Sequence, residues 1–123
     1  TYAGIPLTHR KFASSVVFVT GHEDPEKNEE IVKWKKLAKS VDTIVIMMGL
    51  SRIGIISKQL IEGGMKKSTP VAVIQNGTTT KQKMIVGTLT NIATKIKKEK
   101  MSPPANIIIG EVVKLHKTIG WKK

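Results

Sequence analysis

The stretch PVAVIQNGTTTKQKMIVGTL, residues 70–89, decides how the sheet of this chain is built. Two short apolar runs flank Asn76-Gly77, and both residues of that dipeptide adopt a positive φ at little cost, so it predicts a turn between two strands. We therefore expect the two runs to pair as antiparallel neighbours. The threonine hydroxyls and lysines after the turn could also hold an anion. The segment can thus be a hairpin tip, the wall of a ligand site, or both.

The rest of the chain alternates between strand and helix patterns. Continuous β-branched runs predict three more strands, over residues 14–21, 42–48 and 103–113. Apolar residues at helical spacing predict three helices, over residues 28–40, 51–64 and 90–100. Asn28 is the expected N-cap of the first helix, and Ile31 and Trp34 lie on its apolar stripe. The alternation predicts one α/β domain over residues 1–123, with an open mixed sheet of about five strands and helices on both faces.

Three predicted strands carry a glycine at or just after their carboxyl ends: Gly21, Gly49 and Gly77. In open α/β sheets, ligands bind beyond the carboxyl ends of the strands. A glycine there would let a ligand approach the backbone closely. We therefore expect these three strand ends to meet at one edge of the sheet and to form the candidate site.

Charge and composition narrow the function classes. The 123 residues carry 21 Lys and Arg against 9 Asp and Glu, a net charge of +12, which would attract nucleic acid or a polyanionic small molecule. A basic nucleic-acid-binding module is therefore the alternative from another class. Aromatic residues make up only 4%, too few for a base-stacking platform, and only Arg10 and Arg52 can grip an anion through two parallel bonds.

Further absences exclude several kinds of site. With no cysteine, disulfides and thiolate metal sites are excluded. No apolar run is long enough to span a bilayer, and the first 15 residues lack the apolar core of a signal peptide, so we expect a cytoplasmic protein.

The usual catalytic motifs are missing as well. The three histidines, His9, His22 and His116, lack metal-ligand spacing, so no metal is expected. His9 beside Arg10 could bind an anion or serve as a surface residue, and His22 follows a strand end where a ligand could touch it. No pair of carboxylates suited to acid and base catalysis is visible.

Six segments, taken in order, resemble one family. They are YAGIPLTHR (2–10), SSVVFVTGHE (14–23), IVIMMGLS (44–51), PVAVIQNGTTTKQ (70–82), VGTL (86–89) and IIIGEVV (107–113). Together they resemble the second half of the uroporphyrinogen-III C-methyltransferases, which belong to the tetrapyrrole methylases. The resemblance implies S-adenosylmethionine-dependent methylation of uroporphyrinogen III to precorrin-2, in sirohaem and cobalamin synthesis. A sibling tetrapyrrole methylase is the alternative within the family.

The family resemblance also implies an architecture and particular residues. The family has two α/β domains with the cofactor between them and is typically homodimeric, so this chain would be the carboxyl-terminal domain without its glycine-rich partner domain. Met48 and Gly77 match cofactor contacts, and Ala105 is a weaker match because the spacing differs by two residues. The carboxylate-rich substrate suggests Arg10, with His9, as a clamp. Catalytic residues stay unassigned, and the isolated chain is expected to be inactive.

Overall fold

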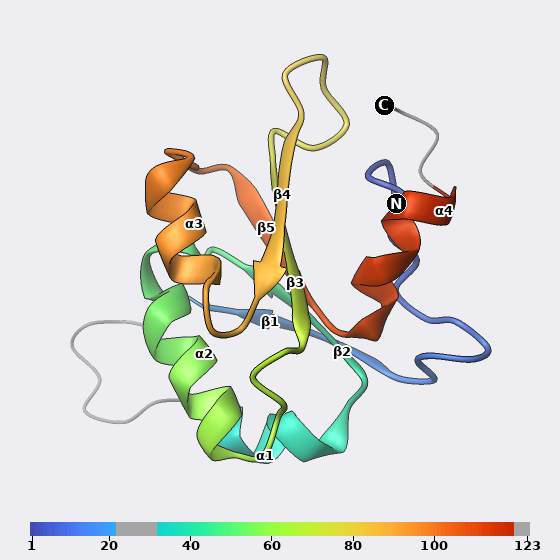
Figure 1. Cartoon of the computed structure of the whole chain (residues 1–123), viewed down its shortest axis with the longest axis vertical. Helices are drawn as coiled ribbons and strands as arrows, with labels where there is room; N and C mark the ends of the chain where they lie inside the picture. Colours follow the sequence, from blue (N-terminus) through green and yellow to red (C-terminus); the bar gives the residue numbers. More distant parts are fainter. Residues whose placement is uncertain (22–31, 120–123) are drawn as a thin grey trace.

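The computed structural model describes residues 1–21 and 32–119 and contains a five-stranded sheet with helices packed against it (Figure 1). The strands are β1 (Val16–Thr20), β2 (Thr43–Met47), β3 (Pro70–Gln75), β4 (Lys83–Thr88) and β5 (Ala105–Ile109). The α-helices are α1 (Trp34–Ser40), α2 (Ile53–Glu62), α3 (Ile92–Lys98) and α4 (His116–Ile119). Two 3₁₀ turns precede α2 and α4, namely η1 (Leu50–Arg52) and η2 (Glu111–Leu115).

The sheet is mixed, as the sequence predicts. Its strand order is β1-β2-β5-β3-β4, with β1 and β2 parallel and every other neighbouring pair antiparallel. Because β5 runs against both β2 and β3, the strands β1, β2 and β3 all point the same way. Their carboxyl ends therefore share one edge of the sheet, which is called the carboxyl edge below.

The main core lies between the sheet and the first three helices. Alternate residues of β2, β3 and β5 face this side and are fully buried, as expected for strands covered by helices. Trp34, which is 1% exposed, packs into this core from the start of α1, and Ile56 and Leu60 pack from α2. The apolar stripes at helical spacing thus fall on the sheet as predicted, and this core fixes the first three helices against one face of the sheet.

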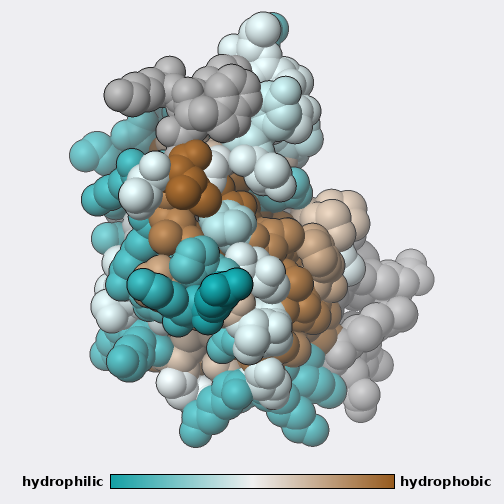
Figure 2. Space-filling model, turned by 90° about the vertical axis from the view of Figure 1, so that its right-hand side faces the viewer, coloured by the Kyte–Doolittle hydropathy of each residue, from teal (hydrophilic) through white to brown (hydrophobic). Residues whose placement is uncertain are grey.

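The opposite face of the sheet has a thinner cover. Ile5 and Ala13 from the amino-terminal segment and Val112 and Val113 from η2 form a second core there. Helical structure therefore lies on both faces, as predicted. The strand expected over 103–113 is too long, because β5 ends at Ile109 and residues 111–113 belong to η2. Gly110 lies between the two elements with a φ of 148°, a value that glycine adopts readily and that ends the strand. Part of this face is bare: Phe18 on the edge strand is 55% exposed, and Figure 2 shows apolar surface on this side of the molecule.

Two of the three predicted helices agree with the structure, and the third is shorter than predicted. The helix expected over 51–64 is observed as α2, and Gly63 follows its last residue. The helix expected over 90–100 is observed as α3. The first helix starts later than the predicted range of 28–40: α1 begins at Trp34, and its N-cap residue is Lys33, whose φ of −91° and ψ of 78° are not helical. The predicted N-cap Asn28 and the stripe residue Ile31 lie outside the described residues.

No helix in the part of the chain that the structure describes has the length and apolar character needed to cross a membrane.

Candidate functional site

The three glycine-bearing strand ends meet at the carboxyl edge, which confirms the placement predicted from sequence. Gly21 follows β1, Gly49 lies just beyond β2, and Gly77 lies just beyond β3. Gly21 and Gly49 are in direct contact: a Cβ atom built on Gly21 would lie 2.5 Å from the Cα atom of Gly49. The strand β5 separates this pair from the end of β3.

The reason for glycine differs among these positions. A Cβ atom on Gly49 would lie 2.4 Å from Cγ2 of Ile46, so Gly21 and Gly49 are required by packing within the chain. A Cβ atom on Gly77 would meet only Cγ2 of Ile74, at 3.5 Å, which is ordinary van der Waals contact. Our expectation that all three glycines make room for a ligand is therefore wrong for the first two, whereas nothing in the described chain requires glycine at position 77.

The loop after β3 is shaped by its own hydrogen bonds. Asn76 has the predicted positive φ of 52°, but Gly77 does not, and the next positive φ, 68°, is at Thr78. The Thr78 hydroxyl donates to the Gly77 carbonyl (2.6 Å) and the Thr79 hydroxyl donates to the Asn76 carbonyl (2.6 Å). These hydroxyl protons are engaged inside the loop, so Thr78 and Thr79 are poorly suited to donate to an anion. The loop extends beyond the sheet as a hairpin tip (Figure 1).

The register of the sheet brings the predicted cofactor residues to the same edge. Met47 pairs with Asn106, so Met48 and Ala105, the next residues along the two antiparallel chains, come to neighbouring positions. Ala105 also pairs with Gln75, the last residue of β3, and Gly77 follows two residues later. Ala105 therefore lies between the strand that leads to Met48 and the strand that leads to Gly77.

Met48 is the most exposed of the large apolar side chains at this edge. Its side chain is 65% exposed, and its backbone has a φ of 54°, an uncommon value for a residue with a side chain. It lines a pocket of about 730 Å³, within the range of small-molecule sites. Gly77 and Ala105 do not line this pocket, although Ala105 packs against the core on the same face of the sheet.

The pocket lies between α2, α3 and the segment that leads into β5. Its lining is mainly apolar, and Ser51 and Lys97 are its hydroxyl- and ammonium-bearing residues. One wall residue could have been found from the sequence, because Ile55 falls off the buried stripe of α2 and is half exposed. The wall from Met101 and Pro103 was missed, because no local pattern shows that the segment before β5 folds back beside α2.

His9 and Arg10 do not join this cluster. They occupy a turn in which the backbone N–H of His9 donates to the carbonyl of Ala13 (2.8 Å), just before β1 begins. The turn therefore lies at the amino ends of β1 and β2, the opposite edge of the sheet. Nδ1 of His9 accepts a hydrogen bond from the backbone N–H of Lys11 (3.1 Å), and Arg10 is exposed.

Asp42 ties the chain together at this opposite edge. Its carboxylate accepts hydrogen bonds from the backbone N–H of Ser14 (2.9 Å) and from the hydroxyls of Ser14 and Ser15 (3.2 Å each). The bond from the Ser14 backbone has the largest effect, and together these bonds hold the pKa of Asp42 below its usual value despite an opposing effect of burial. This carboxylate joins the start of β1 to the start of β2.

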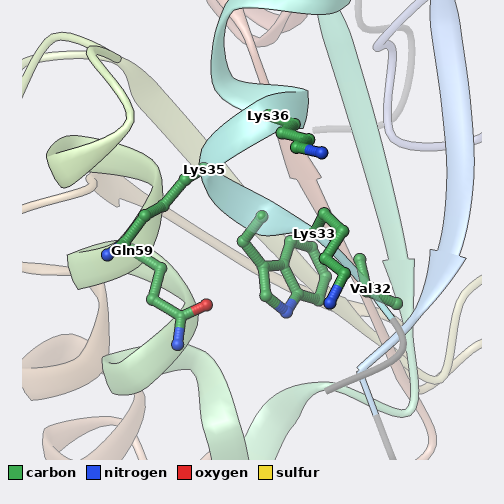
Figure 3. Close-up of a pocket in the computed structure, with 6 residues that line it drawn as sticks. Val32, Lys33, Lys35, Lys36 and Gln59 are labelled. Atoms are coloured by element: carbon green, nitrogen blue, oxygen red, sulfur yellow. The ribbon is translucent and has the colours of Figure 1, made fainter. Parts of the chain in front are cut away.

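A second pocket, of about 320 Å³, lies between α1 and α2 and is basic (Figure 3). Lys35 reaches from α1 toward α2 beside Gln59, and its ammonium group lies 3.3 Å from a carboxylate oxygen of Glu62. Trp34 also lines this pocket, and its buried Nε1 has no hydrogen-bond partner in the described structure. None of the predicted site residues lines this pocket.

Residues 1–21 and 32–119 contain no group of three histidine or acidic side chains that could hold a metal ion. His22, which the sequence placed at a strand end, lies outside the described residues.

Three sequence comparisons with known proteins agree with one another. The sequence profile described as Tetrapyrrole (Corrin/Porphyrin) Methylases matches residues 1–93. An S-adenosyl-L-methionine-dependent uroporphyrinogen III methyltransferase of Methanosarcina barkeri is 48% identical over 99% of this chain and 48% of its own length. A siroheme synthase of Nitrosomonas eutropha is 47% identical over 98% of this chain and 25% of its own length. This chain thus spans about half, or a quarter, of these relatives.

Comparisons with solved structures agree with the sequence comparisons. A uroporphyrin-III C-methyltransferase of Thermus thermophilus, complexed with S-adenosyl homocysteine, superimposes with a TM-score of 0.76 and 30% identity, over 92% of this chain and 49% of that one. A cobalt precorrin-4 methyltransferase reaches a TM-score of 0.80 at 22% identity, which supports the fold alone.

Proposed function

This chain belongs to the tetrapyrrole methylase family, and on that premise we propose that it forms the carboxyl-terminal domain of a uroporphyrinogen-III C-methyltransferase. The enzyme would convert uroporphyrinogen III to precorrin-2. The observation that carries the proposal is the 48% identity to the Methanosarcina barkeri methyltransferase over 99% of this chain. Because the chain spans about half of that relative, we assign the activity to a longer protein in which this domain forms one wall of the cofactor cleft.

The residues at the carboxyl edge fit S-adenosylmethionine as the cofactor. When bound, it supplies a methyl group on a sulfonium, and transfer to an electron-rich pyrrole carbon is an in-line displacement that depends strongly on positioning. A pocket of about 730 Å³ with a mainly apolar lining is large enough for a purine ring or a thioether. Met48 supplies an adaptable apolar wall of this kind.

Gly77 and Ala105 would complete the wall, just after the end of β3 and at the start of β5. Both are small, and the described chain leaves space at position 77 that a larger side chain would fill. We propose that the cofactor lies against the backbone there, so that the segment 70–89 is both a hairpin and a ligand wall. The chain's own role is then to orient the cofactor and to exclude water from one side of it.

The substrate contacts proposed for His9 and Arg10 rest on chemistry alone. A substrate with many carboxylates would be attracted to a chain with a net charge of +12, and Arg10 can pair with a carboxylate. The position of both residues at the opposite edge of the sheet means that any such contact is made away from the pocket beside Met48.

We propose further that the full protein is a cytoplasmic homodimer, and sedimentation measurements on the full protein would test the dimer.

A titration tests the cofactor proposal on this chain. Amide resonances recorded by NMR during addition of S-adenosylhomocysteine should shift saturably at Met48, Gly77 and Ala105. Adenosine at the same concentrations serves as the comparison for the ring alone. Shifts confined to other residues, or no shift at millimolar ligand, would contradict the proposed site.

A further inference from the structure

Met48 has a backbone conformation that its own sequence does not favour. Its φ of 54° lies in the left-handed region, which costs a residue with a side chain free energy unless the surroundings impose it. Its side chain lines the pocket at the carboxyl edge all the same. Something in the fold must therefore hold the backbone on both sides of Met48.

Gly21 holds both neighbours of Met48. The backbone N–H of Gly21 donates to the carbonyl of Met47, at 2.8 Å, and the Cα atom of Gly49 packs directly against Gly21. Gly49 is also pressed against Cγ2 of Ile46, where no side chain of its own would fit. The residues before and after Met48 are thus fixed to the end of β1.

Arg52 in turn holds Gly21. The Nη1 atom of Arg52 donates to the carbonyl of Gly21 at 3.3 Å, in a partly buried position. Arg52 ends the 3₁₀ turn η1, which follows Gly49 directly, so its side chain reaches back across the turn to the neighbouring strand end. The segment from Met47 to Arg52 is therefore closed onto β1 at both of its ends.

From this geometry we propose that Arg52 is a positioning residue: it holds Met48 in the conformation that lines the cofactor pocket, acting through Gly21. Arg52 is not among the residues that line the pocket, so its effect on binding is indirect. The inference rests on the proposed function for its effect on cofactor binding. It adds that Arg52, through Gly21, holds the wall residue Met48 in place. Its structural part concerns the position of Met48 and can be tested without any ligand.

The test compares Arg52→Met with Lys58→Met. Both substitutions remove one positive charge and leave an unbranched apolar side chain, but Lys58 lies on α2 away from the pocket beside Met48. With methionine methyl groups labelled with ¹³C, and Met48→Leu used to assign the resonance, Arg52→Met should move the Met48 methyl signal toward its value in unfolded chains. It should also weaken binding of S-adenosylhomocysteine about tenfold, or 1.4 kcal/mol.

Lys58→Met should leave both the Met48 resonance and the affinity unchanged. Arg52→Lys, which keeps a hydrogen-bond donor, should retain most of the wild-type resonance position and affinity. A Met48 signal that stays in place in Arg52→Met would overturn the proposal. Arg52→Gln provides the same comparison in case the methionine variant does not fold. If the wild type binds no S-adenosylhomocysteine while the Met48 signal still moves in Arg52→Met, the proposed function fails and the positioning role stands.

Discussion

The Cα atom of Gly49 lies so close to Gly21 that a Cβ atom built on Gly21 would come within 2.5 Å of it. The two strand ends therefore meet backbone to backbone, without side chains between them. We expect Gly21→Ala to force them apart and to lower the free energy of unfolding by about 1–3 kcal/mol, the usual cost of overpacking.

Urea unfolding at neutral pH would measure this cost. Gly77→Ala is the matched control, because a Cβ atom there makes only an ordinary contact at 3.5 Å, and its stability should stay within about 0.5 kcal/mol of the wild type. Equal stabilities for Gly21→Ala and Gly77→Ala would show that the strand ends can separate without cost.

The cofactor proposal predicts a different result at Gly77. Gly77→Val should leave the fold intact, because the loop is exposed, but should weaken binding of S-adenosylhomocysteine strongly by placing a branched side chain where the ligand approaches the backbone. NMR titration measures the affinity, and circular dichroism checks the fold. Unchanged affinity in a folded Gly77→Val variant would remove Gly77 from the site and leave the segment as a plain turn.

The hydrogen bonds to the Asp42 carboxylate predict how the free energy of unfolding depends on pH. Because hydrogen bonds from Ser14 and Ser15 lower the pKa of the folded carboxylate, its contribution is fully present above the ordinary pKa of an aspartate. The contribution is lost as the pH falls through the lowered pKa of the folded state. Asp42→Asn should therefore lower the free energy of unfolding at pH 7 by about 1 kcal/mol, the net contribution of a typical intramolecular hydrogen bond.

Urea unfolding of wild type and Asp42→Asn at pH 7 and near pH 3 would show the difference between them shrinking at the lower pH. The variant Glu111→Gln, whose carboxylate pairs with Lys114 on the surface, provides a comparison for the loss of an exposed charge. A difference that stays constant from pH 7 to pH 3 would mean that the carboxylate of Asp42 does not stabilise the fold.

The sequence predicts those strands and helices whose local pattern agrees with the tertiary structure. Apolar runs and helical stripes predicted five strands and the first three helices, and the direction of β1, β2 and β3 followed from their alternation with helices. The carboxyl edge as the meeting place of Gly21, Gly49 and Gly77 could therefore be predicted. The resemblance, and not the pattern, drew attention to Met48 and Ala105.

Other features depend on contacts that no local pattern encodes. The mutual packing of Gly21 and Gly49 arises only when β1 and β2 lie side by side, so the sequence shows two permissive residues but not the reason for them. The hydrogen bond from Arg52 to the Gly21 carbonyl joins residues 31 positions apart. Composition and charge predicted that an arginine could grip an anion, whereas this guanidinium binds the backbone.

The last prediction concerns the affinity of this chain by itself. Its pocket is mainly apolar, with Ser51 and Lys97 as the hydroxyl- and ammonium-bearing residues, so the polar groups of a bound nucleoside would find few partners here. Hydrogen bonds to charged groups contribute about 1.5–3 kcal/mol each, and every 1.4 kcal/mol is a tenfold change in affinity. If a second domain supplies several such bonds, the chain without it should bind S-adenosylhomocysteine orders of magnitude more weakly than the full protein, and should not methylate uroporphyrinogen III. Calorimetry on both forms measures the difference, and an assay for methyl transfer to uroporphyrinogen III measures the activity. Sub-micromolar binding by this chain alone would show that one wall is sufficient for tight cofactor binding and that the affinity does not depend on a second domain.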